Sequence, residues 1–120
     1  MTPIETTSLL LPEAPQAPLV IIDVRLRKVR DAAGRPLAVT LRSLLLLWEL
    51  ARNEGHPVTF SSLIEGMFNR PLDGEADMRL LTTHVYNLRK VMPRDQDGDS
   101  IIRSWRGVGY WVLQGIVAFG

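Results

Sequence analysis

Residues 84–113 decide the fold, and they read HVYNLRKVMPRDQDGDSIIRSWRGVGYWVL. Apolar residues recur every three or four positions in the first part, which predicts a helix. Pro93 ends that helix, because proline lacks the N–H group that a helix interior needs. Two strand-like runs joined by a glycine-containing turn follow. The stretch therefore predicts a helix over about residues 76–92 and a β-hairpin over residues 101–113.

Two shorter helices are expected upstream of this stretch. Thr40 is a favourable N-cap for the helix-forming run 41–53, and Gly55 is placed to end that helix. Thr59 is placed to cap a second helix that runs to about Phe68. The tight turn between the two helices is typical of the first half of a helix-turn-helix unit.

The N-terminal part alternates between apolar and polar residues. Residues 19–40 therefore predict two or three short antiparallel strands. The first 18 residues contain four prolines, and the last six are small and apolar. We expect a flexible N-terminal arm at 1–18, one domain at 19–114, and a short tail at 115–120 that either completes a strand or frays.

Composition excludes several classes of protein. With 120 residues and a hydrophobic fraction of 46%, the chain is long and apolar enough for one domain with a real core. It has no cysteine, which excludes disulfides, thiolate metal sites and cysteine nucleophiles. No signal peptide and no apolar run of membrane-spanning length is present, so we expect a cytoplasmic protein without a membrane partner.

No catalytic, metal or cofactor site is expected either. The only histidines are His56 and His84, and His84 lies at the edge of an apolar helix face, where a packing role is favoured over metal binding. The acidic run 95–100 lacks the glycine and the glutamate that a calcium loop requires at its sixth and twelfth positions. With no phosphate-binding glycine loop and no Ser-His-Asp set, we expect that the protein is not an enzyme.

The two faces of the 76–92 helix differ in chemistry. One face is apolar and is expected to pack on the core: Met78, Leu81, Val85, Leu88 and Met92. The other face is polar and basic: Arg79, Thr83, Tyr86, Asn87 and Lys90. The only acid on this helix is Asp77, near its start. Asparagine can pair with adenine, threonine can touch a thymine methyl group, and arginine or lysine can bond guanine or phosphate, so this face fits the major groove of DNA.

The hairpin adds a second candidate contact. Arg106 lies at its turn, where an arginine can enter the negative potential of a narrow minor groove. We expect the neighbouring aromatic residues to anchor the hairpin on the core rather than to stack on bases: Trp105, Tyr110 and Trp111. The net charge of +1 is low for a nucleic-acid binder, although six basic residues stand against four acids in 76–113.

Four segments carry a family resemblance: GRPL at 34–37, LRSLLLLWELARNEG at 41–55, HVYNLRK at 84–90 and RGVGY at 106–110. In this order and spacing they resemble the OmpR/PhoB-type winged helix-turn-helix domain, the DNA-binding half of many bacterial two-component response regulators. The resemblance implies an α+β fold with a four-stranded N-terminal antiparallel sheet, three helices and a C-terminal β-hairpin wing.

The resemblance also implies roles for individual residues. Thr83 and Asn87 would face bases, Tyr86 and Arg89 would lie toward phosphates, and Arg106 would be the minor-groove arginine of the wing. The remaining basic residues complete the expected DNA-binding set: Arg79, Lys90 and Arg103. Loop 69–75 would contact RNA polymerase, and the domain would pair head to tail on direct repeats.

Departures from the family pattern leave questions open. Asn87 stands where arginine is common, Phe60 where the second helix often has a basic residue, and Ser43 where glutamate is common. No receiver domain is present in these 120 residues. The chain is therefore either a stand-alone regulator, of an orphan or phage-like type, or an excised domain.

Two functions remain in competition. We expect a regulator of transcription that binds specific duplex DNA as a monomer in solution and pairs on the DNA. The alternative is a protein-interaction module of the same fold that binds RNA polymerase, a sigma factor or another regulator. The low net charge, Phe60 and the acidic loop 95–99 favour the alternative.

Overall fold

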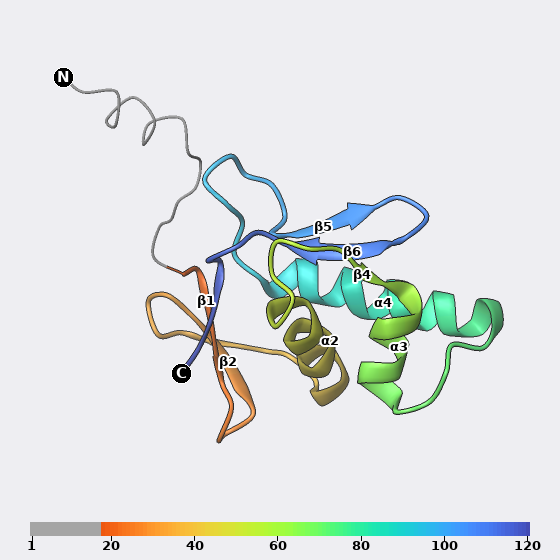
Figure 1. Cartoon of the computed structure of the whole chain (residues 1–120). Coiled ribbons are helices and arrows are strands. Elements are labelled where there is room, and N and C mark those ends of the chain that lie inside the picture. Colours follow the sequence, from red (N-terminus) through yellow and green to blue (C-terminus); the bar gives the residue numbers. More distant parts are fainter. Residues whose placement is uncertain (1–17) are drawn as a thin grey trace.

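Three helices form the centre of the molecule, with one small sheet beside them at the N-terminal side and a second one above them (Figure 1). The computed structural model describes residues 18–120, so the expected arm lies, apart from Pro18, outside the described residues. The fold is α+β, as predicted.

The helices follow the sequence expectations closely. They are α2 (Leu41–Ala51), α3 (Phe60–Phe68) and α4 (Gly74–Val91). The hydroxyl oxygens of Thr40 and Thr59 accept hydrogen bonds from the backbone N–H groups of Ser43 and Ser62, at 3.2 and 3.1 Å, so both predicted N-caps are confirmed. Helix α2 ends two residues earlier than expected.

Helix α4 begins at Gly74, about two residues before the predicted start. The carboxylate of Asp77 reaches back and accepts a hydrogen bond from the backbone N–H of Asp73, at 2.7 Å. This bond satisfies a donor that a helix start leaves without a partner, which extends the ordered helix toward its N-terminus. At the other end α4 stops at Val91, before Pro93, as predicted.

The first sheet has the strand order β3-β2-β1-β7. Its strands are β1 (Val20–Asp23), β2 (Lys28–Asp31), β3 (Pro36–Leu37) and β7 (Val117–Phe119). The first three are antiparallel, as expected, but the fourth comes from the C-terminal end of the chain and lies parallel to β1. Of the two outcomes for residues 115–120, the strand is correct.

The position of β7 has a physical reason. Strand β1 would otherwise present a row of unpaired backbone groups at the edge of the sheet. The side chain of Val117 is buried, and the ring of Phe119 packs edge-on against Trp48 of α2, with 5.0 Å between the ring centres. Backbone pairing and apolar burial therefore act together to hold the last strand.

The second sheet has the order β4-β6-β5. The hairpin of β5 (Ile102–Trp105) and β6 (Gly109–Val112) is the predicted wing, and β4 (Val58–Thr59), from the link between α2 and α3, pairs with β6. Within residues 18–120, no helix is both long enough and apolar enough to cross a bilayer.

Candidate nucleic-acid interface

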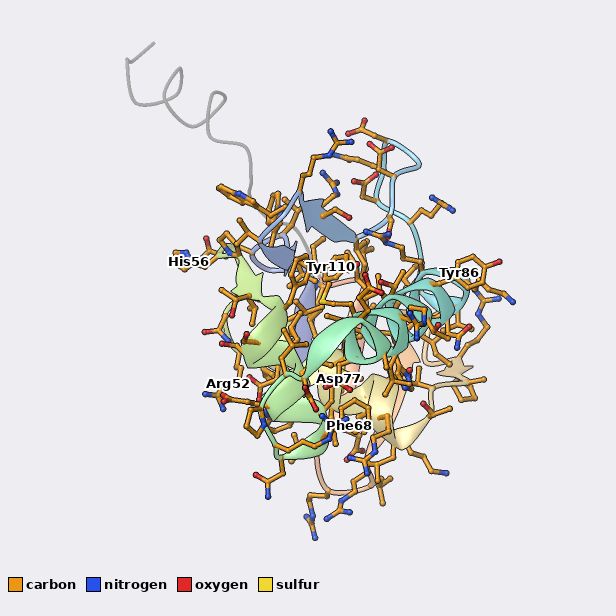
Figure 2. The ribbon with its side chains drawn as sticks, turned by 90° about the vertical axis from the view of Figure 1, so that its right-hand side faces the viewer. Arg52, His56, Phe68, Asp77, Tyr86 and Tyr110 are labelled. Atoms are coloured by element: carbon orange, nitrogen blue, oxygen red, sulfur yellow. The ribbon has the colours of Figure 1, made fainter. Side chains whose placement is uncertain are left out.

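Helix α4 separates its residues into a buried face and an exposed face, as predicted. Its predicted core residues are buried, apart from Met78, which is half-buried. The residues of the predicted outer face are all exposed: Arg79, Thr83, Tyr86, Asn87 and Lys90. Figure 2 shows Tyr86 at the edge of the molecule on the outer side of α4, where 61% of the residue is exposed.

Helix α4 has two acids, both in its first turn: Glu75 is exposed and pairs with Arg79 at 3.9 Å, whereas Asp77 points inward. Asp77 is only 5% exposed, and its carboxylate accepts two hydrogen bonds from the guanidinium of Arg70, at 2.7 and 2.8 Å. The Arg70 bonds, followed by the bond from the Asp73 N–H, lower the pKa of Asp77 to about 2. Because its charge is compensated and buried, Asp77 adds no negative charge to the outer face, which carries no carboxylate from residue 78 to residue 91.

The ion pair between Asp77 and Arg70 was missed by the sequence reasoning. The two residues are separated by a loop, so no helical periodicity relates them. Arg70 also lies over the ring of Phe68, at 5.3 Å, and Arg42 lies near the same ring, at 4.8 Å. Through Arg70, loop 69–73 is therefore held both to Phe68, at the end of α3, and to Asp77, in the first turn of α4.

The polar side chains on the outer face keep bonding capacity for a ligand. The Thr83 hydroxyl donates to the Arg79 carbonyl, at 2.9 Å, which leaves its oxygen lone pairs and its methyl group available. The amide of Asn87 makes no hydrogen bond within residues 18–120. The ammonium of Lys90 lies 5.4 Å from the ring centre of Tyr86. The face therefore presents donors, acceptors, a methyl group and an aromatic ring together.

Arg89 is only half exposed and connects α4 to the wing. Its Nε and Nη2 atoms donate to the Ile102 carbonyl, at 3.2 and 2.9 Å, and Nη2 also donates to the Ser104 hydroxyl, at 3.0 Å. The Nη1 donors have no partner among the described residues and remain free for an anion. Arg89 thus fixes the distance between α4 and β5 and adds positive charge between them.

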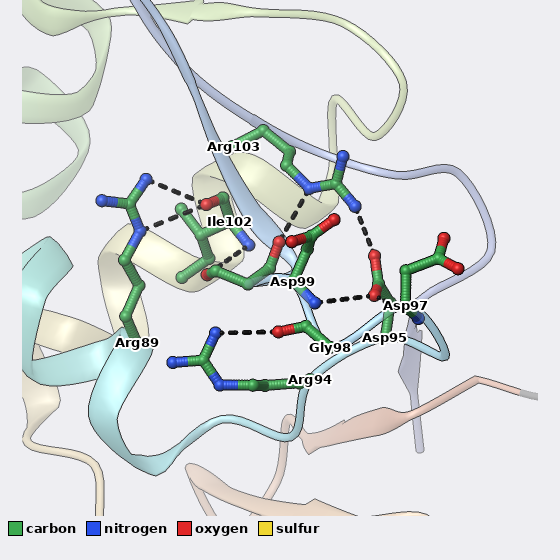
Figure 3. Close-up of polar contacts among 9 residues, drawn as sticks. Arg89, Arg94, Asp95, Asp97, Gly98, Asp99, Ile102 and Arg103 are labelled. Carbon is green, nitrogen blue, oxygen red and sulfur yellow. Dashed lines mark hydrogen bonds and ion pairs between the residues drawn. The ribbon is translucent and has the colours of Figure 1, made fainter.

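Arg103 lies at the base of the wing, where its charge is already compensated (Figure 3). Its Nη2 atom is ion-paired with the carboxylate of Asp95, and its Nε atom donates to the Ser100 carbonyl, at 2.7 Å. The same carboxylate accepts from the backbone N–H groups of Asp99 and Asp97, which lower its pKa together with Arg103. Unlike the α4 residues of the predicted set, Arg103 is held by loop 93–100.

The two glycines of the wing have different physical roles. Gly107 adopts a φ of +78° in the turn, which the Val108 N–H closes by bonding the Trp105 carbonyl at 2.9 Å. Gly109 lies in β6, where a Cβ atom would come within 1.8 Å of the Val58 carbonyl oxygen. Gly109 therefore permits β4 to pair closely with β6, and Arg106 projects from the turn as an exposed residue.

The three aromatic residues of the wing were expected to anchor the hairpin on the core, which is correct for Tyr110 and wrong for Trp105. Tyr110 packs edge-on against Phe60, with 5.9 Å between ring centres, and Trp111 is half-buried. Trp105, however, is 51% exposed. It ends β5 beside the turn, and its cross-strand partner Gly109 has no side chain to cover it.

His84 has the expected packing environment. Its Nδ1 lies 3.0 Å from the hydroxyl of Ser43, and its ring lies 6.3 Å from the ring of Phe68. Burial, with a smaller effect of the Arg42 charge, lowers the pKa of His84 and favours the neutral form. Among the described residues, no group of three or more histidine or acidic side chains is arranged to hold a metal ion.

The comparisons with known proteins agree with this geometry. A family model described as "Transcriptional regulatory protein, C terminal" matches residues 34–112. The DNA-binding domain of CpxR from E. coli superposes with a TM-score of 0.71 at 22% identity, covering 88% of this chain and 97% of that one. A search of curated protein sequences found no match.

Two further solved structures share the fold. The Klebsiella pneumoniae RstA DNA-binding domain, in complex with the RstA box, has a TM-score of 0.68 at 23% identity, covering 82% of this chain and 95% of that one. The Thermotoga maritima response regulator DrrB, an OmpR/PhoB homolog, has a TM-score of 0.62 at 26% identity, covering 77% of this chain and 40% of that one. With the family model spanning most of the chain, this protein belongs to the family of C-terminal domains of transcriptional regulatory proteins, in its OmpR/PhoB-type winged helix-turn-helix form.

Proposed function

We propose that this chain regulates transcription by binding specific sites on duplex DNA, with α4 in the major groove and the wing at the adjacent minor groove. The observation that carries the proposal is the outer face of α4, which is exposed and basic and carries no carboxylate from residue 78 to residue 91. Of the two acids in the first turn, Asp77 is turned inward onto Arg70, and the exposed Glu75 lies 3.9 Å from the guanidinium of Arg79. A solvated helix without a ligand usually mixes acids with bases. The solved RstA domain, which has the same fold, is in complex with its DNA box.

The residues of the interface divide by role. Thr83 and Asn87 read base edges, since a free amide and a methyl-bearing side chain suit adenine and thymine. Four others contact the phosphates that border the major groove: Arg79, Tyr86, Arg89 and Lys90. Arg106 enters the minor groove. Arg103 supports the wing from its base, because its guanidinium is already bonded to Asp95 and Ser100.

The first experiment selects the preferred site from a pool of random duplexes and measures affinity by fluorescence anisotropy over a range of salt concentrations. Phosphate contacts release counterions, so log K should fall linearly with log salt, by about 0.9 per phosphate contact. Arg106→Ala should weaken binding most on A·T-flanked sites and leave the melting temperature nearly unchanged. Arg25→Ala, at an exposed arginine in the turn between β1 and β2, is the charge-matched control.

The alternative function, a protein-interaction module, is favoured by two observations on charge. The charge of Arg103 is compensated by Asp95, and the net charge of the whole chain is only +1. RNA polymerase, contacted through the loop that precedes α4, is the partner in that case. Absence of salt-dependent binding to any duplex, together with retention of purified RNA polymerase on the immobilised protein, would favour this alternative over DNA binding.

A further inference from the structure

Trp105 is the one tryptophan of this chain that the fold leaves largely uncovered. Trp48 packs against Phe119, and Trp111 is half-buried, whereas Trp105 is 51% exposed. A tryptophan side chain offers about 150–250 Å² of surface for burial, so about 100 Å² of indole faces solvent here. A flat apolar surface of this size at the end of an ordered strand is available for a partner.

The cross-strand position leaves the indole without a neighbour. Trp105 is paired with Gly109, which has no side chain to cover it. Gly109 is in turn confined to glycine by the Val58 carbonyl oxygen, 1.8 Å from where a Cβ atom would lie. Because the close packing of β4 on β6 requires glycine at position 109, no side chain from β6 can cover Trp105 at this cross-strand position.

The direction of Trp105 follows from the alternation of side chains along β5. Ser104 faces α4, because its hydroxyl accepts a hydrogen bond from Arg89. Successive side chains of a strand point to opposite faces, so Trp105 lies on the face of the wing that is turned away from α4. Arg106 follows directly, at the exposed turn between these two faces.

We infer that Trp105 contacts the sugar–phosphate backbone that borders the minor groove on the side away from α4. The inference rests on the proposed function, because it requires the wing to lie on duplex DNA. With Arg106 in the groove, the backbone nearer to α4 is met from the Arg89 and Ser104 side. The opposite backbone is left to Trp105, whose ring packs on deoxyribose and whose Nε1–H donates to a phosphate oxygen.

This contact makes the wing sensitive to the width of the groove. A·T tracts narrow the minor groove, which brings the far backbone toward the indole, whereas a wider groove moves it out of reach. Arg106 then senses the electrostatic potential of the groove, and Trp105 senses its width. The effect on affinity is independent of the bases that α4 reads.

The direct test is ¹⁹F NMR of the full chain with 5-fluorotryptophan at its three tryptophan positions. The resonance of Trp105 is identified as the one absent from Trp105→Phe. On addition of the duplex recovered by selection, the chemical shift of the Trp105 resonance should change, and its dependence on solvent composition should fall because the indole becomes covered. The chemical shift of the Trp48 resonance should not change. An unchanged Trp105 resonance at saturating DNA would overturn the inference and leave the proposed function intact.

Affinity measurements on two duplexes give the second readout. On a site with A·T flanks, Trp105→Ala should weaken binding about tenfold, because the indole surface is no longer buried on binding. On the same core site with G·C flanks the loss should be smaller, and Trp105→Phe should lose less than Trp105→Ala on both. Leu26→Ala, at a residue 65% exposed in the β1–β2 turn, is the matched apolar control and should bind normally.

Each outcome separates the two proposals. Equal affinity of wild type and Trp105→Ala on the A·T-flanked site would remove Trp105 from the interface. A wild-type protein that binds no duplex in a salt-dependent manner would overturn the proposed function, and the role of Trp105 with it.

Discussion

Replacement of Gly109 by alanine tests the physical basis of the wing. The added Cβ atom would meet three backbone atoms of β4: the Val58 oxygen at 1.8 Å, the Val58 carbon at 2.7 Å and the Thr59 Cα at 2.9 Å. None of these belongs to a flexible side chain, so the clash is relieved only if β4 and β6 separate. The separation must take the closest approach from 1.8 Å to the 3.4 Å of ordinary contact.

The energetic cost follows from the hydrogen bonds that this movement breaks. The Phe60 N–H donates to the Val108 carbonyl at 3.0 Å, and hydrogen-bonded pairs alternate along an antiparallel ladder. The Val58–Tyr110 pair therefore exchanges two bonds and the Thr59–Gly109 pair none, which makes about three bonds in all. Each lost hydrogen bond reduces stability by about 1 kcal/mol. We therefore expect Gly109→Ala to lower the free energy of unfolding by about 3 kcal/mol, at the upper end of the usual range for overpacking.

Gly107→Ala is the matched control within the same hairpin. A Cβ atom at Gly107 meets nothing within 4 Å, so only the positive φ of +78° opposes the substitution. That conformation costs an alanine about 1–2 kcal/mol. The clash at Gly109 therefore accounts for the difference between the two variants.

Urea unfolding, followed by circular dichroism at fixed temperature and protein concentration, measures both changes. Both variants should keep a single cooperative transition, with that of Gly109→Ala at the lower urea concentration. If Gly109→Ala is no less stable than Gly107→Ala, the close approach of β4 is not what requires glycine at this position, and the reasoning fails.

Four further predictions concern the interface and the assembly. Asn87→Ala should lose about 1–3 kcal/mol of binding free energy on the preferred duplex and little on random duplexes in anisotropy titrations; equal losses would show that Asn87 does not read bases. Lys90→Ala should weaken binding on all duplexes and reduce the salt slope by roughly one unit, and an unchanged slope would place Lys90 away from the phosphates. Asp77→Asn should lower the melting temperature at neutral pH. Because the folded pKa of about 2 lies below the ordinary value of 3.8, the stabilisation is present above pH 3.8 and is lost as the pH falls toward 2, so the two melting curves should converge over that interval. Light scattering of the free protein should give the mass of a monomer. A tight dimer at low micromolar concentration would contradict this prediction, and the edge strand β7 would then be the first candidate for pairing between two copies.

Local patterns in the sequence were sufficient for most of the fold. The periodicity of apolar residues defined the three helices and the buried face of α4, because one turn of a helix repeats every 3.6 residues whatever lies elsewhere in the chain. Thr40 and Thr59 were recognisable as caps because a cap acts over three residues. The turn of the wing followed from its glycines for the same reason.

The candidate site was predictable only in part. The exposed residues of α4 followed from the helical wheel, but the outward direction of Trp105 did not, because it depends on which face of the hairpin packs toward α4. The inward turn of Asp77 depends on Arg70, which reaches it from the preceding loop. The partner of Arg103 depends on how loop 93–100 folds beside β5.

The sequence alone thus determined the helices, the caps of α2 and α3, the wing and the chemistry of the exposed α4 face. Only the tertiary structure decided that the last strand of the chain pairs in parallel with the first, that Gly109 is required by β4, and that the acids Asp77 and Asp95 are each compensated by an arginine. The physical reason is the range of the interactions. Helix periodicity, caps and turns act within a few residues, whereas strand partners, close backbone contacts and ion pairs between elements exist only after packing has brought distant segments together.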